Sequence, residues 1–320
     1  MSKILVLLGQ RMLTLVPLVI GIVLLVTLVM EPAKDNAAYA YFQGANVTPE
    51  QIATFKHEAG LDRPVLVRFV DYLFNMVQGD FGVSSLSGTP VAEKISTAFP
   101  LTLQLTIYGV LIAMVMALVL GVVAALFRNG WPDQLIRAVS LIGVASPSFW
   151  LALLFIQYFA IQIGWFPSGG YINPQESFTG FLATMTLPAL ALALPVGAQV
   201  TRIVRTSMVE ELDKDYVRTA RGAGIPYGVV VSRNVLRNGL INPMTVLGLR
   251  VGYLLGGAVI IETIFTLPGM GQVLIDAVRD SDLPVLQGVV LVIALSFVVV
   301  NLIVDVLNLM VNPRLRTGNA

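Results

Sequence analysis

Long uncharged apolar runs constrain this chain more than any other feature of its sequence. Only 12% of its residues are charged and 56% are hydrophobic, whereas a soluble domain carries about 25% charged residues. A helix needs roughly 20 apolar residues to cross the hydrocarbon core of a bilayer. Runs of that order predict an all-α membrane protein with six spanning helices, which are expected at Met12–Met30, Phe99–Phe127, Ala138–Gly164, Phe181–Thr201, Gly239–Ile261 and Leu283–Met310.

The first apolar run could be either a cleaved signal peptide or a retained spanning helix. Lys3 and Arg11 form a basic flank, and the alanines of residues 37–40 could imitate a cleavage site. However, residues 12–30 are 19 uncharged residues in a row, which exceeds the usual apolar core of a signal peptide. We therefore expect residues 1–30 to comprise the N-terminus and the first spanning helix.

The distribution of charge predicts the orientation of the chain. If both termini are cytoplasmic, the inner segments carry 13 Lys and Arg against 5 acidic residues, and the outer segments carry 6 against 13. Cytoplasmic loops of membrane proteins are enriched in Lys and Arg. Both termini and residues 202–237 are therefore expected in the cytoplasm, and six spans agree with termini on the same side.

Residues 31–98 are expected to form a small extracytoplasmic segment. Thr48 and Gln51 have the spacing of a capping box around Pro49, which predicts the start of a helix. A second helix is expected after Asp62-Arg63-Pro64, and its apolar positions share one face; they are Val65, Phe69, Leu73 and Met76. This segment could cap the membrane helices or offer a surface to an extracytoplasmic partner. The remaining residues, 99–320, are expected to form a five-helix core.

A polar island interrupts the core at residues 202–237, where eleven charged side chains gather. A helix that starts at Asp215 would present one face made of Tyr216, Thr219, Ala220 and Ala223. Three of these four residues are small, which allows close docking, and tyrosine is a favoured interface anchor. Asp215 could cap this helix, and two glycines could let the chain turn away from it. The alternative is a basic loop that lies on anionic lipid.

The island resembles the cytoplasmic loop of ABC importer permeases, most closely the first permease of the dipeptide and oligopeptide branch. Its centre reads Asp-Tyr-Val-Arg-Thr-Ala-Arg from Asp215, and Gly224 follows. The general pattern of these permeases, Glu-Ala-Ala and then Gly, is matched by Arg218-Thr219-Ala220 and Gly224, so the acidic residue is missing. Further similarities along the chain include Gly79-Asp80-Phe81-Gly82, Pro147-Ser148-Phe149-Trp150, Pro268-Gly269-Met270-Gly271 and Asn312-Pro313-Arg314.

The resemblance implies a non-enzymatic permease subunit, with the type I importer fold, in a bacterial-type plasma (inner) membrane. It implies four kinds of partner: a second homologous permease, two cytoplasmic ABC ATPase subunits or domains that use ATP and Mg²⁺, an extracytoplasmic substrate-binding protein, and a peptide. Similar permeases carry nickel, glutathione or haem, and these remain alternatives. The resemblance assigns ATPase coupling to Asp215, Tyr216, Arg218, Thr219, Ala220, Arg221, Ala223 and Gly224.

Two charges are expected within the membrane, Arg250 in the fifth span and Asp305 in the sixth. A charge that faces lipid costs about 2.5–3.5 kcal/mol on insertion scales. Gly248, Gly252 and Gly256 form a small-residue stripe suited to close packing, and Arg250 points away from it. We expect the two charges to form an ion pair, with a cationic wall that contacts a peptide carboxylate as the alternative.

Several other functions are disfavoured by residues that the chain lacks. It has no Gly-x-x-x-x-Gly-Lys-Ser/Thr phosphate loop, so no ATP hydrolysis of its own is expected. Without cysteine and with one histidine, it offers no thiolate metal site and no His-Glu-x-x-His protease motif. Its net charge of +1 argues against nucleic acid. An intramembrane enzyme or an ion channel remains a distant alternative, and no cofactor is expected in this chain.

Overall fold

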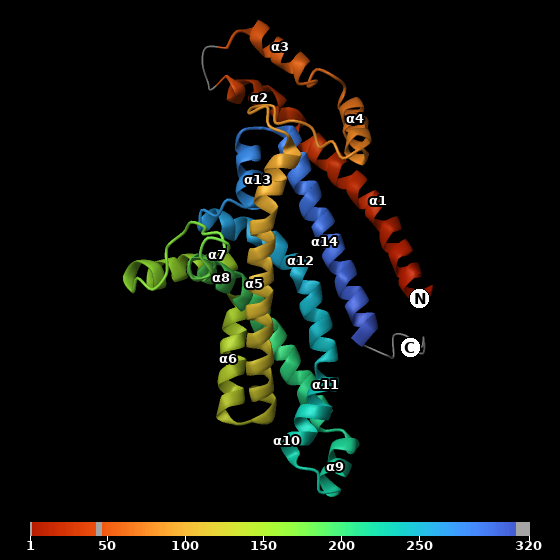
Figure 1. The fold of residues 1–320 in the computed structure, drawn as a ribbon, viewed down its shortest axis with the longest axis vertical. Helices are drawn as coiled ribbons and strands as arrows, with labels where there is room; N and C mark the ends of the chain where they lie inside the picture. The colour runs from red at the N-terminus through yellow and green to blue at the C-terminus, as the bar shows by residue number, and fades with distance from the viewer. Residues whose placement is uncertain (1, 43–46, 312–320) are drawn as a thin grey trace. The chain divides into compact units, whose positions relative to one another are not determined.

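The computed structural model describes residues 2–42 and 47–311, which are helical apart from turns, loops and one isolated antiparallel bridge between Val83 and Pro90. Within its helices, the side chains of residues 2–12, 14–15, 33–35, 305 and 307–311 are outside the described part. The chain divides into two compact units. One comprises Met1–Leu103 and Thr266–Val298, and the other comprises Gln104–Phe265 and Val299–Ala320 (Figure 1).

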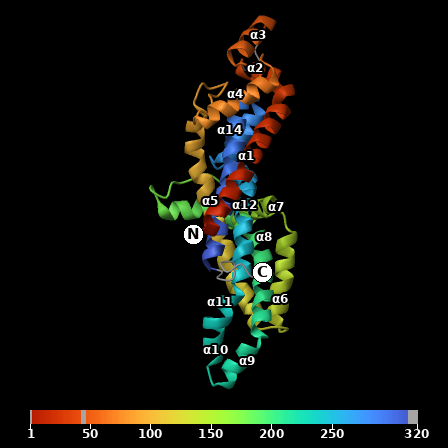
Figure 2. The same ribbon diagram turned by 90° about the vertical axis from the view of Figure 1, so that its right-hand side faces the viewer.

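The first unit contains the N-terminal helices and the segment that was expected outside the membrane. Its helices are α1 (Ser2–Met30), η1 (Glu31–Ala33), α2 (Lys34–Tyr41), α3 (Pro49–Glu58), α4 (Val65–Val77) and α13 (Met270–Arg279), together with the first parts of α5 (Val91–Leu126) and α14 (Leu283–Val311). Figure 2 shows α2, α3 and α4 gathered near the C-terminal end of α1. The short α2 was not anticipated, because no apolar period marks its sequence.

The expected local signals of the outer segment are confirmed. Thr48 caps α3, its side chain accepts a hydrogen bond from the backbone of Gln51, and the Gln51 side chain bonds back to Thr48. Beyond the end of α3, Gly60 adopts a φ of 65°, which glycine reaches without strain. Phe69, Leu73 and Met76 of α4 pack on Val19 and Val23 of α1 and on Leu291 of α14. Three of the four residues of the predicted face of α4 therefore join this hydrophobic cluster, and the fourth, Val65, is half-buried outside it.

Two buried polar contacts hold the segments of this unit together. The Asp282 carboxylate accepts hydrogen bonds from the Ser84 hydroxyl at 2.5 Å and from the Ser85 backbone at 3.2 Å. The Gln287 amide donates to the Thr27 hydroxyl at 2.6 Å. Because a buried polar group is costly without a partner, these bonds fix the loop before α5 and the start of α14.

The second unit is built around α8 (Phe178–Leu212). Its other helices are α6 (Trp131–Ala145), α7 (Ser148–Phe155), the π-helix η2 (Ile156–Gln162), α9 (Asp215–Gly222), α10 (Tyr227–Val230), the π-helix η3 (Val231–Val235), α11 (Leu236–Gly239) and α12 (Ile241–Ile264), with the remainder of α5 and α14. Both α6 and α12 pack along α8. A Cβ on Gly143 of α6 would lie 2.8 Å from the Cβ of Ala198 on α8, so the glycine permits this close approach.

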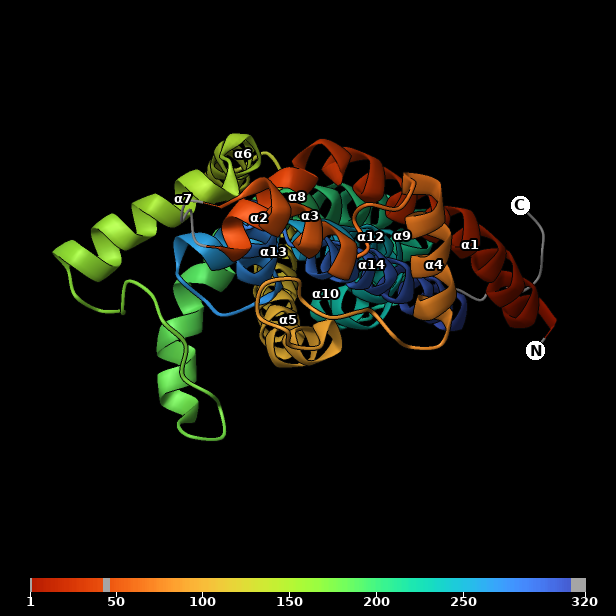
Figure 3. The same ribbon diagram turned by 90° about the horizontal axis from the view of Figure 1, so that it is seen from above.

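The prediction of a single straight helix at Ala138–Gly164 is wrong. Instead, α6 ends at Ala145, and the helix of α7 and η2 runs on at 103° to it. Ser146 between them is extended, with φ −85° and ψ 122°. Proline disfavours the helical conformation of the residue before it, so Pro147 accounts for the break. In Figure 3, α7 runs away from the end of α6.

Among the residues that the structure describes, four helices are long and apolar enough to cross a membrane, judged by length and composition: α5, α8, α12 and α14. The bent pair of α6 with α7 and η2 makes a fifth if it forms one span. Within α1, Val16–Met30 is a shorter apolar helix. The six-span count therefore stays a prediction. The helix α8 extends beyond its expected span at both ends, whereas α12 begins two residues after its expected start.

Candidate functional site

The expected coupling segment forms a short helix at one end of the second unit. Figure 1 shows α9 and α10 grouped below α8 and α12 in that unit. The helix α9 covers Asp215–Gly222, but its N-cap is Lys214, which makes no capping side-chain bond. The expectation that Asp215 caps the helix is therefore wrong, because Asp215 is itself the first helical residue. At the other end, Gly224 has a φ of 79°, which lets the chain turn out of the helix.

Tyr216 points back towards α8. Its hydroxyl donates a hydrogen bond of 2.9 Å to the buried carboxylate of Glu211, in the last turn of α8. The Lys214 ammonium donates to the other oxygen of the same carboxylate at 2.5 Å. Burial, followed by the neighbouring Glu211, raises the pKa of the Tyr216 phenol, so the hydroxyl is the donor at neutral pH. These bonds fasten the start of α9 to the end of α8.

The exposure of α9 separates an inner from an outer face. Val217 is buried, and Tyr216 and Ala220 are half-buried against the rest of the unit. Thr219 and Ala223 are exposed. The predicted face is therefore split: its large aromatic residue serves as an internal anchor, whereas two small residues remain available to a partner.

The outer surface of the segment also carries arginines and apolar side chains. Arg218 and Arg221 are exposed, and the Arg221 guanidinium lies 5.3 Å from the centre of the Tyr227 ring. Beyond the turn, Ile225, Tyr227 and Val229 each leave nearly half of their surface uncovered. Exposed apolar groups next to charges are typical of a protein-binding surface. These three apolar residues were not singled out from the sequence.

Two ion-pair contacts join neighbouring helices close to this segment. The fully buried Asp133 of α6 accepts hydrogen bonds from Arg205 of α8 at 2.8 and 3.2 Å, and from the backbone of Asn129 at 3.0 Å. Arg128 in the turn before α6 pairs with Asp213 at 2.8 Å. This turn and the end of α8 therefore lie at the same end of the second unit, as expected if both are cytoplasmic. The role of Asp133 was not foreseen, because nothing near it in the sequence marks its distant partner.

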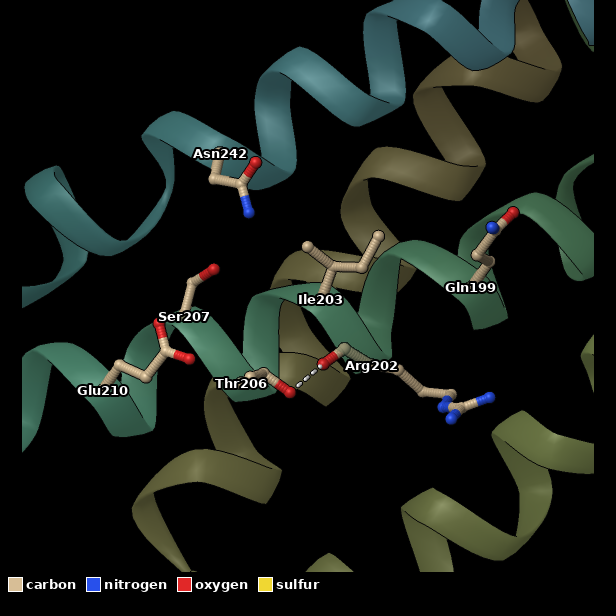
Figure 4. A pocket seen from close by; sticks show the side chains of 7 residues that line it. All are labelled: Gln199, Arg202, Ile203, Thr206, Ser207, Glu210 and Asn242. Carbon is tan, nitrogen blue, oxygen red and sulfur yellow. Dashed lines mark hydrogen bonds between the residues drawn. The ribbon is translucent and has the colours of Figure 1, made fainter. Parts of the chain in front are cut away.

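A polar cleft of about 420 Å³ runs along the C-terminal half of α8 and reaches α12 (Figure 4). Its lining is polar apart from one aliphatic residue and consists of Gln199, Arg202, Ile203, Thr206, Ser207, Glu210 and Asn242. The α8 members recur at helical spacing, so they share one face of the helix. An arginine and a glutamate in one groove offer both a cationic and an anionic contact. The cleft was not predicted, although this spacing could have revealed it.

Arg250 is half-buried on α12, whereas the side chain of Asp305 lies outside the described part of the chain. The expected ion pair therefore stays a prediction. On the same helix, a Cβ at Gly248 would collide with Val304 of α14. Arg250 lies about 200° around the helix from Gly248, so α14 packs on the face from which Arg250 points away. The Gly248 contact agrees with close packing at the glycine stripe, but Gly256 faces open space.

Within the ranges that the structure describes, no cluster of His, Cys, Asp and Glu could hold a metal ion. The Asn312-Pro313-Arg314 similarity falls outside those ranges.

Comparison with known proteins gives a consistent result over nearly the whole chain. Residues 117–317 match the model of the binding-protein-dependent transport system inner membrane component, and residues 4–106 match the model of the N-terminal part of such membrane components. A putative peptide transport system permease protein of Brucella abortus is 37% identical over 96% of this chain and 98% of its own length. The glutathione transport system permease protein GsiC of Escherichia coli K12 is also 37% identical, over 96% of this chain and 97% of its own length.

Proposed function

Because this chain belongs to the family of binding-protein-dependent transport system inner membrane components, we propose that it is the transmembrane permease subunit of an ATP-driven importer of peptides. It forms half of the translocation pathway in a bacterial inner membrane. The relatives named as peptide transport permeases support the choice of substrate. Glutathione is the second candidate, since a relative of equal identity is named for its transport.

The proposed mechanism rests on one observation, the attachment of α9 to the end of α8 by hydrogen bonds. Tyr216 and Lys214 fasten its start to Glu211 at the end of α8, and Thr219, Arg221 and Ala223 face outwards. A helix that is tied to a long spanning helix and open on its other side can transmit motion between a soluble partner and the membrane. We propose that ATPase subunits, which bind ATP and Mg²⁺, dock on this open side and move α8 through the anchor.

The cytoplasmic end of the substrate route is proposed to run along the polar cleft of α8, most of whose lining residues fall within residues 202–237. A route for peptides through a membrane needs hydrogen-bonding groups to replace water, because an unsatisfied polar group is costly in an apolar setting. Arg202 and Glu210 suit the two charged termini of a peptide. Arg250 extends the proposed route on α12, because it lies away from the face on which α14 packs. A second permease would supply the opposite wall.

The proposed arrangement places both termini and residues 202–237 in the cytoplasm, with residues 31–98 outside. An extracytoplasmic binding protein would deliver the substrate to that outer side. The balance of Lys and Arg across the chain supports this orientation.

Uptake by cells that carry this chain tests the proposed substrate. Radiolabelled dipeptides, a longer peptide and glutathione would be supplied to the parent cells, to cells that lack the chain, and to deleted cells that express it again. Loss and restoration of peptide uptake is expected, with uptake of a single amino acid as the unchanged control. Loss of glutathione uptake alone would favour the second candidate, and unchanged uptake of all three would contradict the proposal.

A further inference from the structure

The helix α4 of the first unit carries an apolar face that the unit leaves uncovered. Its side chains fall into three sectors around the helix axis. One apolar sector, with Phe69, Leu73 and Met76, packs into the core. A polar sector contains Arg68, Asp71, Asn75 and Gln78. A second apolar sector spans about 100° of the helix and is strongly exposed, and its members are Leu66, Val67, Val70, Phe74 and Val77.

The packing of α4 places its core sector against α1, which is expected to span the membrane. Its core sector rests on Val19 and Val23 of α1, which precede the end of that helix at Met30. At 1.5 Å per residue, these contacts lie about 10–17 Å before the end of α1. This depth is within the uncharged run of residues 12–30. The outer half of α1 also leaves Leu25, Leu28 and Val29 exposed, so this half of α1 carries uncovered apolar surface as well.

A cleft of about 510 Å³ opens beside the polar sector of α4. Leu61 and Arg63 of the preceding loop, Arg68, Tyr72 and Phe74 of α4, and Pro284 and Gln287 of α14 are among its lining residues. The wall is thus part apolar and part polar. It combines the exposed apolar sector with the first turn of α14, where residues 283 and 284 mark the start of a candidate span.

Two donors at this cleft have unmet hydrogen-bonding capacity. The Arg68 side chain is only 9% exposed, and its Nη1 donates to Glu31 at 2.7 Å. Its Nη2 and the Tyr72 hydroxyl are both buried and have no hydrogen-bond partner among the residues that the structure describes. Burial, followed by the charge of Asp80, raises the pKa of the Tyr72 phenol, so its proton is retained. Buried donors without a partner call for an acceptor, and a molecule bound in the cleft can supply it.

The charges at the cleft limit what this acceptor can be. Arg68 pairs with Glu31, and the exposed Arg63 pairs with Asp71 at 3.2 Å, so the surroundings are close to neutral overall. A zwitterionic head group fits such a setting, with its phosphate oxygens towards Arg68 and its ammonium towards Asp71. The apolar sector of Val70 and Phe74 suits acyl chains, which favours a lipid over a free anion.

We propose that α4 lies in the outer leaflet of the membrane and that its cleft binds a zwitterionic phospholipid, with the phosphate at Arg68 and Tyr72 and the acyl chains along Val70 and Phe74. The choice of leaflet rests on the orientation proposed above, and the placement in the membrane rests on α1 as a span. The site would fix the outer segment to the bilayer surface as an interfacial helix.

Spin labels test the position of α4, since the chain has no cysteine of its own. Single labels at Phe74→Cys and at Glu58→Cys on α3 would be compared in the assembled, reconstituted transporter. The transporter with the unsubstituted chain gives the background. At Phe74→Cys we expect high collision rates with oxygen and low rates with a water-soluble nickel chelate, and at Glu58→Cys the reverse. Chelate access at Phe74→Cys, or an immobilised label that neither reagent reaches, would overturn the proposal, the latter by indicating a protein partner.

Lipid analysis of the purified transporter tests the head-group contacts. Loss of one charged hydrogen bond should reduce the retained phospholipid roughly tenfold in Arg68→Gln. Tyr72→Phe keeps the ring in the core and should also reduce it, whereas Lys56→Gln on α3 serves as the unchanged control. If both variants, Tyr72→Phe and Arg68→Gln, were well folded and retained as much phospholipid as the wild type, the proposed site would be contradicted.

Restoration experiments separate a lipid from a free anion. After delipidation, added phosphatidylethanolamine should raise the melting temperature of the wild-type transporter more than that of Tyr72→Phe. Inorganic phosphate alone should not reproduce this difference. Equal protection by inorganic phosphate would show an anion site and would overturn the assignment to a phospholipid.

Discussion

Glu211 organises the candidate site at the scale of single residues. Its buried carboxylate accepts both the Lys214 ammonium and the Tyr216 hydroxyl. The sequence allowed the α9 helix and its small residues to be predicted, but not this anchor, because it joins residues across the turn between two helices. The pairing of Asp133 with Arg205 was hidden for a different reason, because 72 positions separate the two residues along the chain. In contrast, the capping box of Thr48 and Gln51 was predictable, because its partners are three residues apart.

Removal of the Tyr216 hydroxyl should loosen α9 without changing the surface that it offers to a partner. A buried hydrogen bond to a carboxylate stabilises a folded protein by about 1.5–3 kcal/mol. Because Tyr216 is only half-buried, loss of its hydroxyl should reduce the stability of this contact by about 1 kcal/mol. We expect Tyr216→Phe to lower peptide uptake per ATP hydrolysed in proteoliposomes. Tyr39→Phe is the control, because Tyr39 is an exposed tyrosine of α2 in the first unit. Equal effects of the two variants would show that the Glu211 bond has no special role.

A substitution at Arg250 distinguishes two roles for this residue: it either lines the substrate pathway or forms an ion pair with Asp305. If Arg250 lines the pathway, away from the face of α12 on which α14 packs at Gly248, Arg250→Gln should assemble normally and reduce uptake of peptides with a free C-terminal carboxylate. Amidated peptides provide the control within the same experiment. If Arg250→Gln instead assembled poorly and a further Asp305→Asn change restored it, the two charges would be partners. Removing one member of a buried pair can cost about 3–5 kcal/mol.

At the scale of elements, apolar periodicity predicted most helices, but it missed the break in the helix before Pro147. The face of α4 was predictable from the spacing of Phe69, Leu73 and Met76. This break was not predicted, because the apolar run continues through it. Hydropathy does not report the restriction that a proline places on the backbone of the residue before it. The exposed second face of α4 was also missed, since a sequence shows apolar residues without showing which of them are covered.

The contact between α6 and α8 should depend on the absence of a side chain at Gly143. An added methyl group would lie 2.8 Å from Ala198, whereas the nearest atoms to one at Gly109 would be 3.6 Å away. We expect Gly143→Ala to destabilise the purified protein by about 1–3 kcal/mol through overpacking. Gly109→Ala, also within a helix, should be tolerated. Thermal unfolding in detergent would measure both, and a Gly143→Ala variant as stable as Gly109→Ala would contradict the close contact between these helices.

At the scale of the whole molecule, the family and the membrane setting were predictable, because they depend on motifs and composition spread over the chain. The predicted orientation rests on the distribution of charge. Contacts such as Arg128 with Asp213 and Ser84 with Asp282 agree with pairs of loops on common sides.

Cysteine labelling of intact cells measures that orientation. An impermeant maleimide should label Glu58→Cys in the outer segment and leave Gly222→Cys on α9 unlabelled, because positive charge keeps residues 202–237 inside. Both positions are exposed, so both should react once the membrane is permeabilised. Labelling of Gly222→Cys alone in intact cells would reverse the proposed topology.

The ratio of peptide uptake to ATP hydrolysis, in proteoliposomes that contain the complete transporter, tests most directly whether α9 couples the two processes. Ala223→Glu places a charge on the open face of α9, where it would be desolvated by a docked partner. Glu58→Gln on α3 is the control. The account predicts a folded Ala223→Glu transporter whose ATP hydrolysis no longer drives uptake, with wild-type coupling in the control. Wild-type coupling in Ala223→Glu would contradict the assignment of α9 as the coupling element.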